Sequence, residues 1–173
     1  MNWLDEYQPM DGVRLNMIST PEGEFVGATG SSRDISNSLD RSLIIRLRQL
    51  SDVFVTGGNT YRIEKYRKPS ISKLAVISSS QMILPDGVIR LELENALDKL
   101  NSTGFRRILL EVGPSLAKYF LEKNLVDEFC LTIPNGSEPD AAKVCKSLGA
   151  SLVLASTVKI DDTLFTRWRR GNV

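Results

Sequence analysis

Two short segments of the sequence place small and polar residues where a chain could wrap around a phosphate group. Residues 56–60 follow an apolar, β-branched run and read TGGNT, so backbone amides can approach an anion closely while side chains add donors. Residues 111–116 read EVGPSL, with proline where the first turn of a helix would begin. The free amides of that turn and the positive end of the helix dipole could hold a phosphate. Each segment is also typical of a structural turn, so neither identifies a ligand alone.

A third candidate is the polar loop at residues 19–36, which is rich in Gly and Ser and is long enough to cover a substrate or to be an idle surface excursion. The charged residues near these three segments are Glu22, Asp34, Glu64, Glu111 and Arg48. Most such groups in proteins are solvated surface charges, so both interpretations stay open from composition alone.

The 173 residues contain no histidine, which excludes several kinds of catalysis. This absence removes the commonest general base, the commonest metal ligand and every Ser/His or Cys/His nucleophile. The sequence also lacks a Walker lysine pattern, a GxGxxG after its first strand and a metal-ligand cluster, so we expect no metal. Hydride transfer from a nicotinamide remains possible, because the cofactor carries that chemistry and the protein supplies position and electrostatics.

The composition predicts one globular domain over residues 1–173, with its core at about 13–169. Lys and Arg total 22 against 21 Asp and Glu, so no overall charge favours nucleic acid or a membrane surface. Cys130 and Cys145 lack the spacing of a disulfide or metal motif, and we expect buried free thiols. The first residues carry acids and no apolar h-region, which predicts a cytoplasmic protein.

Apolar runs and apolar periodicity predict alternating strands and helices. The expected strands are residues 13–18, 52–55, 74–77, 106–111 and 129–133, with a closing pair at 151–155 and 164–168 that turns at Asp161 and Asp162. Four helices are expected. The first begins near Leu39 after a cap at Ser36 or Asn37, the second covers residues 91–100, the third begins at Gly113 and Pro114, and the fourth covers residues 140–148. This order predicts an α/β fold with a mostly parallel central sheet, an antiparallel C-terminal edge and helices on both faces. In such sheets ligands bind beyond the carboxyl ends of the strands, where all three candidate segments lie.

Several segments, taken in order, resemble the reductase domain of the bifunctional riboflavin-biosynthesis deaminase/reductase and the stand-alone bacterial pyrimidine reductases. The matching segments are VRLNMISTPEG at 13–23, IRLRQLSDVFV at 45–55, TYRIE at 60–64, EVGPSLA at 111–117 and LVDEF at 125–129. The last two are specific because they occur in the family's order and at its spacing, whereas isolated glycine loops would not be. The resemblance covers roughly residues 13–169.

The resemblance implies a three-layer, dihydrofolate-reductase-like fold that binds NADPH. It implies reduction of the ribosyl group of 5-amino-6-(5-phosphoribosylamino)uracil to ribityl by hydride transfer. The implied catalytic residues are Glu64 and Glu111. The implied cofactor-binding residues are Gly57, Gly58, Thr60, Glu64, Ser78, Ser79, Gly113, Pro114, Ser115 and Leu116. The implied substrate-binding residues are Asn16, Ser32, Arg48 and Glu111, with Arg48 neutralising the substrate phosphate.

The sequence departs from the family at several positions. Glu22 replaces the aspartate of the first turn, Val112 replaces a glycine or alanine beside the cofactor turn, and Asp34 falls where many relatives have tryptophan. No counterpart of the deaminase domain is present. Two alternatives therefore stay open, a reductase of another pterin or pyrimidine-like substrate and a degenerate, non-catalytic nucleotide-binding member. We also expect a homodimer with residues 129–133 and 151–155 near the interface, because an apolar edge strand needs cover.

Overall fold

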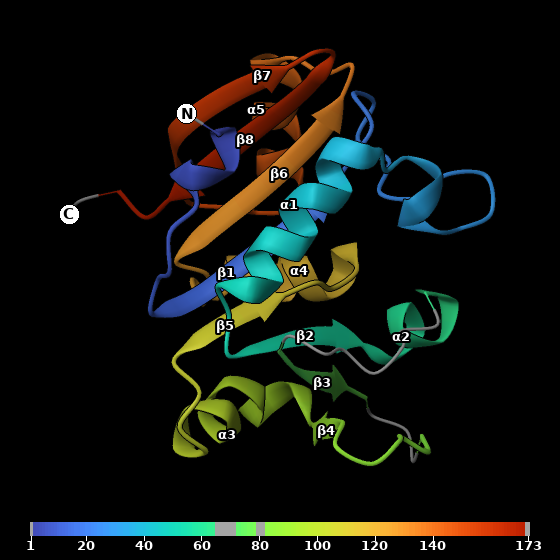
Figure 1. Cartoon of the computed structure of the whole chain (residues 1–173), viewed down its shortest axis with the longest axis vertical. Helices are drawn as coiled ribbons and strands as arrows, with labels where there is room; N and C mark the ends of the chain where they lie inside the picture. Colours follow the sequence, from blue (N-terminus) through green and yellow to red (C-terminus); the bar gives the residue numbers. More distant parts are fainter. Residues whose placement is uncertain (1, 65–71, 79–81, 172–173) are drawn as a thin grey trace.

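The computed structural model describes residues 2–64, 72–78 and 82–171 of the chain, and Ser79 of the predicted cofactor site lies outside them. The described strands form one eight-stranded sheet in the order β4-β3-β2-β5-β1-β6-β8-β7 (Figure 1). Their bounds are β1 Gly12–Ile18, β2 Val53–Gly57, β3 Lys73–Ile77, β4 Ile89–Leu91, β5 Arg107–Leu110, β6 Glu128–Pro134, β7 Val153–Ile160 and β8 Thr163–Arg169. All neighbouring strands from β4 to β6 run parallel, and β8 pairs antiparallel with both β6 and β7. The predicted mostly parallel sheet with an antiparallel C-terminal edge is confirmed.

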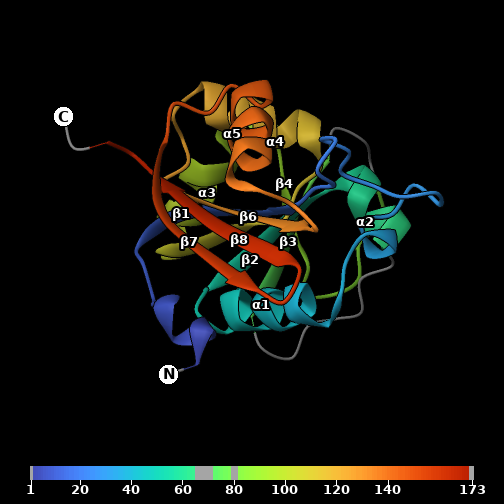
Figure 2. The same ribbon diagram turned by 90° about the horizontal axis from the view of Figure 1, so that it is seen from above.

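Helices cover both faces of this sheet, as Figure 2 shows. Their bounds are α1 Ser38–Gln49, α2 Gly58–Glu64, α3 Ala96–Ser102, α4 Pro114–Glu122 and α5 Glu138–Ser147, with 3-10 turns at Trp3–Glu6, Ser32–Asp34 and Leu93–Asn95. α1 and the N-terminal turn lie on one face, whereas α3, α4 and α5 lie on the other. Strand side chains alternate between the two faces, so Val13, Leu15 and Met17 join the core under α4 and α5, while Phe54 packs in the core under α1.

The first long helix forms where its periodicity predicts. Asn37 is its cap, and its side-chain oxygen accepts a hydrogen bond of 2.9 Å from the backbone amide of Asp40. Leu43 and Leu47 recur on the buried face and pack against the sheet. The cap and the apolar stripe together fix the direction in which the helix crosses the sheet.

Two local predictions are wrong. Residues 56–60 were expected to form a loop, but β2 runs through Gly57 and α2 starts directly at Gly58. Leu91 was expected in a helix, but it ends β4, and the helix begins only at Ala96 after a 3-10 turn. Both elements are short and their formation depends on tertiary contacts, which override local glycine content and apolar spacing.

The premise of the dimer prediction is also wrong in one respect. β6 is an internal strand between β1 and β8, and Phe129, Leu131 and Ile133 are fully buried within the chain. The exposed edge is β7, where Val153 and Leu154 are 54% and 39% exposed. The other edge of the sheet is the three-residue strand β4, so of the two segments in the dimer prediction only the one that belongs to β7 lies at an edge.

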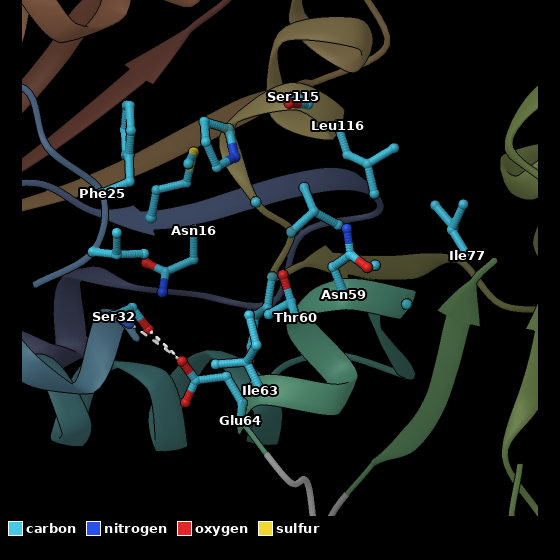
Figure 3. Close-up of a pocket in the computed structure, with 18 of the residues that line it drawn as sticks. Asn16, Phe25, Ser32, Asn59, Thr60, Ile63, Glu64, Ile77, Ser115 and Leu116 are labelled. Carbon is cyan, nitrogen blue, oxygen red and sulfur yellow. Dashed lines mark hydrogen bonds between the residues drawn. The ribbon is translucent and has the colours of Figure 1, made fainter. Parts of the chain in front are cut away.

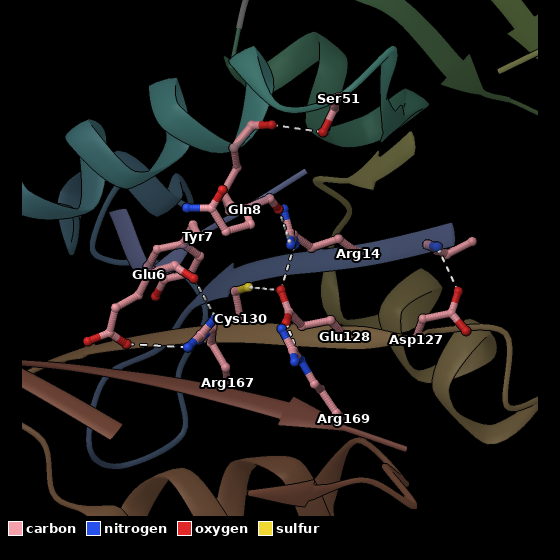
Figure 4. Close-up of polar contacts among 12 residues, drawn as sticks. Glu6, Tyr7, Gln8, Arg14, Ser51, Asp127, Glu128, Cys130, Arg167 and Arg169 are labelled. Carbon is pink, nitrogen blue, oxygen red and sulfur yellow. Dashed lines mark hydrogen bonds and ion pairs between the residues drawn. The ribbon is translucent and has the colours of Figure 1, made fainter. Parts of the chain in front are cut away.

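A buried ionic cluster crosses the sheet on the α1 side (Figure 4). The carboxylate of Glu128 on β6 is fully buried and accepts hydrogen bonds from Arg14 on β1 at 2.7 Å and from Arg169 on β8 at 2.6 Å. Burial acts to raise the pKa of Glu128, but the two guanidinium groups hold that pKa below its usual range. The cluster ties three neighbouring strands together.

Arginine side chains from three elements also anchor the N-terminal segment across this face. Arg46 donates to the carbonyl of Tyr7 at 3.2 Å, Arg14 to that of Gln8 at 3.1 Å, and Arg167 to that of Glu6 at 2.8 Å. Cys130 and Cys145 are buried free thiols, as predicted. Among the described residues, no helix combines the length and the apolar character needed to cross a membrane.

Candidate functional site

A cleft of about 2020 Å³ opens at the carboxyl ends of the parallel strands. Every predicted site residue that the structure describes lines this cleft. They are Asn16, Ser32, Arg48, Gly57, Gly58, Thr60, Glu64, Ser78, Glu111, Gly113, Pro114, Ser115 and Leu116. The three candidate segments, which are distant in sequence, therefore meet in one place, as the topology of an open α/β sheet requires.

The segments after β2 and β5 are in direct contact at one end of the cleft (Figure 3). A Cβ atom on Gly57 would lie 2.8 Å from Leu116, and a Cβ on Gly58 would lie 3.2 Å from Met82 and 3.3 Å from the Ser78 hydroxyl. A side chain at either glycine would therefore push into its neighbours. The two glycines therefore let Leu116, Met82 and Ser78 pack closely against the start of α2.

The first turn of α4 faces the same end of the cleft. Gly113 is the N-cap of α4, no side chain caps the helix, and Pro114 occupies the first turn. Val112, which departs from the family pattern, is buried in the core under α4 while also lining the cleft. Because the valine side chain packs in the core, it does not block the turn at Gly113.

Glu64 at the end of α2 holds the loop at residues 19–36 against the cleft. Its carboxylate accepts a hydrogen bond of 3.2 Å from the Ser32 hydroxyl (Figure 3). It also accepts one of 2.7 Å from the Ser31 hydroxyl and forms an ion pair of 2.7 Å with Arg33. Arg33 also donates to the backbone carbonyl of Glu64. The loop is therefore fastened to the helix that begins at the predicted cofactor turn. The predicted catalytic and cofactor-binding roles of Glu64 stay predictions, and its carboxylate is already occupied by these contacts.

Asp34 gives the same loop its closed shape. Its carboxylate accepts hydrogen bonds from the amide of Thr29 at 2.8 Å and from the Thr29 hydroxyl at 2.7 Å, and these bonds lower the pKa of Asp34. A Cβ atom on Gly27 would lie 2.3 Å from the Asp34 side chain, so the turn needs glycine there. Asp34 is therefore a structural residue that closes the loop.

Arg48 and Glu111 form a bidentate ion pair in the wall of the cleft. The two contacts measure 2.7 Å from Nε to Oε1 and 2.5 Å from Nη2 to Oε2. The guanidinium also lies 4.3 Å from the centre of the Phe54 ring. The Arg48 side chain is 25% exposed and that of Glu111 is 9% exposed. Because the pair has no net charge, a substrate phosphate would compete with Glu111 for the guanidinium.

Part of the lining of the cleft is apolar. Three large hydrophobic side chains that line it, Val26, Ile45 and Ile63, are exposed, and the partly buried Phe25 lines it as well. Exposed apolar groups in a concave site are typical of ligand binding and suit a flat ring.

Sequence reasoning missed three acidic residues of the cleft, Asp40, Glu92 and Glu94, of which only Asp40 is buried. Asp40 lies in the first turn of α1, lines the cleft and is 1% exposed. Asn16, a predicted substrate residue that lines the same cleft, has a buried side-chain oxygen with no hydrogen-bond partner among the described residues. Asp40 was overlooked because its helix was assigned from apolar residues, although an acid in the first turn after a polar loop was a usable signal.

The sheet topology, the helices on both faces and a cleft at the strand ends define a dihydrofolate-reductase-like α/β protein. The family model described as the RibD C-terminal domain matches residues 12–134, and the chain belongs to this family. Membership confirms the resemblance predicted from the sequence and the reductase class of riboflavin biosynthesis that it implies. No curated protein matches the chain in sequence.

Solved structures share the fold at low identity. A pyrimidine reductase-like protein from Corynebacterium diphtheriae superposes with a TM-score of 0.75 at 21% identity, covering 95% of this chain and 94% of that one. A riboflavin biosynthesis reductase from Saccharomyces cerevisiae gives 0.61 at 13% identity, with 98% of both chains covered. The deaminase/reductase from Thermotoga maritima gives 0.68 at 16% identity, covering 93% of this chain and only 57% of that one. At these identities the likeness shows the fold alone.

Proposed function

We propose that the protein transfers a hydride from NADPH to the ribosyl carbon of 5-amino-6-(5-phosphoribosylamino)uracil and releases the ribityl product. The observation that carries this proposal is the meeting of two sets of residues in one cleft. Gly57, Gly58 and the first turn of α4 lie at one end, and Asn16 and the Arg48–Glu111 pair line the same cleft. At about 2020 Å³ the cleft exceeds the roughly 300–1,000 Å³ typical of a site for one drug-sized ligand, so it has room for a dinucleotide and a second molecule.

The residues present fit a dinucleotide at the glycine-rich end. The first turns of α2, which begins at Gly58, and of α4, which no described side chain caps, offer backbone amides to phosphate groups, while Thr60 and Ser78 line the same part of the cleft with hydroxyl groups. When bound there, the cofactor supplies the hydride. The chain itself contributes position and exclusion of water.

At the substrate end of the cleft, three polar residues would contact the substrate. Asn16 on β1 offers an amide to the hydroxyl groups of the sugar, and Ser32 is placed beside it by the contact with Glu64. Glu111 is fixed in one orientation by Arg48, so it can accept a hydrogen bond from the substrate without reorganising. The apolar side chains of Val26 and Ile63 would pack against the ring.

A comparison of NADPH with NADH in thermal unfolding tests the cofactor assignment. NADPH at 100 times its dissociation constant should stabilise the fold by about 2.7 kcal/mol, and NADH at the same concentration should stabilise it less. The reason is that clustered amides and hydroxyls near Ser78 favour the additional 2′-phosphate. Equal shifts with the two cofactors, or no shift with either, would count against the proposal.

A second candidate is reduction of another pyrimidine or pterin-like substrate. The observation that favours it is the ion pair between Arg48 and Glu111. The positive charge of Arg48, which was predicted to bind the substrate phosphate, is already neutralised by the carboxylate of Glu111. Turnover assays with a phosphorylated and a dephosphorylated ribosylaminopyrimidine separate the two candidates, because only the first requires the phosphate.

The assembly and the location of the protein belong to the same proposal. We propose a homodimer that buries the exposed residues of β7, and a protein that acts in the cytoplasm, where its nucleotide cofactor is available.

A further inference from the structure

Reduction of a ribosyl group needs a proton as well as a hydride. The hydride forms a new C–H bond at C1′, the C1′–O4′ bond breaks, and O4′ takes the electron pair and a proton to become a hydroxyl group. NADPH supplies the hydride, so the protein or solvent must supply the proton. The usual donor is histidine, which this chain lacks entirely.

Most carboxyl groups of the cleft are poorly suited to the task. The cleft-lining carboxyls are Asp40, Glu64, Glu92, Glu94 and Glu111. Glu64 and Glu111 each accept hydrogen bonds from a guanidinium, which occupies the oxygen atoms that would carry a proton. Glu92 and Glu94 are exposed and follow β4, which is the edge strand at the far end of the sheet from β7.

Asp40 differs from these in every respect. It is 99% buried, forms no ion pair with any residue that the structure describes, and its Oδ1 atom has no hydrogen-bond partner there. Its Oδ2 atom accepts a hydrogen bond of 2.7 Å from the hydroxyl of Ser36. Ser36 is only half-buried and itself lines the cleft, so its hydroxyl connects the buried carboxyl to the ligand space.

The groups around Asp40 favour its protonated form. Burial raises the pKa of Asp40 above its usual range, and the carboxylate of Glu111 at the end of β5 acts in the same direction. The hydrogen bond from Ser36, the nearby hydroxyl of Thr132 on β6, which does not complete a hydrogen bond to Asp40, and the charge of Arg41 on α1 act to lower the pKa and are outweighed. A carboxyl with a raised pKa stays protonated to a higher pH than an ordinary aspartate and can therefore donate a proton.

We propose that Asp40 supplies the proton for this reduction through the hydroxyl of Ser36. When Asp40 is protonated on Oδ2, the hydrogen bond between the two residues reverses and Asp40 donates to the Ser36 hydroxyl. Ser36 can then donate its own proton to the leaving O4′ and receive one from Asp40, because a hydroxyl can donate and accept at the same time. Asp40 becomes a carboxylate and is reprotonated from solvent, so each turnover consumes one NADPH and one proton. Ser36 touches the substrate and Asp40 acts through it. The inference rests on the proposed function.

The test uses single-turnover hydride transfer from NADPH across a range of pH. The wild-type rate should be constant at low pH and should fall as pH rises through the pKa of Asp40, because the donor is lost. Asp40→Asn and Ser36→Ala should slow hydride transfer by about 10²- to 10⁴-fold and remove that fall. The matched control is Asp98→Asn, an exposed aspartate in the first turn of α3, which should leave the rate and the pH profile unchanged.

An infrared measurement tests Asp40 without turnover. The wild type and Asp98→Asn should show the carbonyl band of a protonated carboxyl at a pH where ordinary aspartates are ionised, and Asp40→Asn should lack it. A wild type without the band, or an Asp40→Asn enzyme that keeps the wild-type rate and pH profile, would overturn the donor role of Asp40 but not the proposed function. A folded wild type that shows the band but transfers no hydride to the pyrimidine would overturn the proposed function and the donor role with it. If Asp40→Asn fails to fold, the wild-type band and Ser36→Ala decide.

Discussion

The pairing of Arg48 with Glu111 shows what a single residue's identity can and cannot predict. Both residues were assigned to the substrate site from the sequence, and both line the cleft. Their mutual contact was not foreseen, because residues 63 positions apart become neighbours only once α1 and β5 are placed beside each other. The position of Asp40 in the first turn of α1 could have been read from the sequence, but its burial depends on residues that come much later in the chain, such as Thr132 on β6. Residue types at loop ends predict membership of a site, whereas partners and burial depend on tertiary structure.

Replacing Arg48 tests whether the pair serves the substrate. Arg48→Ala should lower kcat/KM by about ten- to a hundredfold, because a charge-assisted hydrogen bond is worth about 1.5–3 kcal/mol, and should leave NADPH affinity nearly unchanged. Arg48→Lys should recover only part, since an ammonium cannot reproduce the two-pronged contact with Glu111. Steady-state kinetics on the ribosylaminopyrimidine phosphate measures both.

Part of the effect of Arg48→Ala on stability will come from leaving Glu111 unpaired. The double variant Arg48→Ala/Glu111→Gln should restore most of the lost unfolding free energy without restoring kcat/KM, as urea unfolding and kinetics of the same samples will show. An unchanged kcat/KM in Arg48→Ala would refute the substrate role of the pair.

Among the elements, long apolar runs and capped periodic helices were predictable and short connecting ones were not. β1, β2 and β3 follow from β-branched runs, and α1 follows from its cap and apolar stripe. α2 was missed because it starts at a glycine pair that is typical of loops, and β4 because it has only three residues. Contacts between Glu64 and the loop at residues 19–36 stabilise both the loop and α2, and these contacts cannot be read from the sequence of α2 alone.

Removing the Glu64 carboxylate should release this loop. Glu64→Ala removes the hydrogen bonds to Ser31 and Ser32, each worth about 0.5–1.5 kcal/mol, together with the ion pair to Arg33. We expect faster hydrogen exchange of the amides at residues 27–36 and an increase in KM for the pyrimidine, with kcat less affected. Glu64→Gln should have a smaller effect, because an amide oxygen still accepts from the serines and the lost ion pair involves an Arg33 side chain that is 68% exposed.

The matched control for Glu64 is Glu122→Ala on α4, which breaks an exposed ion pair of 3.6 Å with Lys118 far from the loop. Exchange at residues 27–36 should be the same in this variant and in the wild type. Equal protection of the loop in Glu64→Ala would mean that the contact does not hold the loop in place.

The site of the cleft follows from the topology of the whole molecule. Parallel strands bring their carboxyl ends to one edge, so the order of strands and helices in the sequence was enough to predict where three distant segments would meet. The identity of the exposed edge was not predictable in this way. Phe129, Leu131 and Ile133 gave β6 the composition of a strand that needs cover, and β8 provides that cover within the chain.

The exposed apolar residues of β7 predict self-association through this strand. Light scattering at micromolar concentration should give twice the 19.3 kDa mass of the chain for the wild type. Leu154→Lys should shift the mass to that of one chain, because a charge on an edge strand opposes pairing with a second copy. Ile83→Lys, at a side chain that is 95% exposed away from β7, should leave the mass at the wild-type value. A wild type of 19.3 kDa at this concentration would refute the dimer.

The central position of β1 has a consequence for the order of events during synthesis on the ribosome. β1 pairs on one side with β5 and on the other with β6, so neither hydrogen-bonded neighbour of this early strand exists until the chain has grown beyond residue 107 and then residue 128. At translation rates of about 5–20 residues per second, β1 would wait roughly 5–25 seconds for both partners. The N-terminal turn waits longer still, because Arg167 on β8 is among the groups that anchor it. During that interval β1 lacks both of its hydrogen-bonded neighbours, which makes this apolar strand a natural target for a chaperone that binds extended apolar segments.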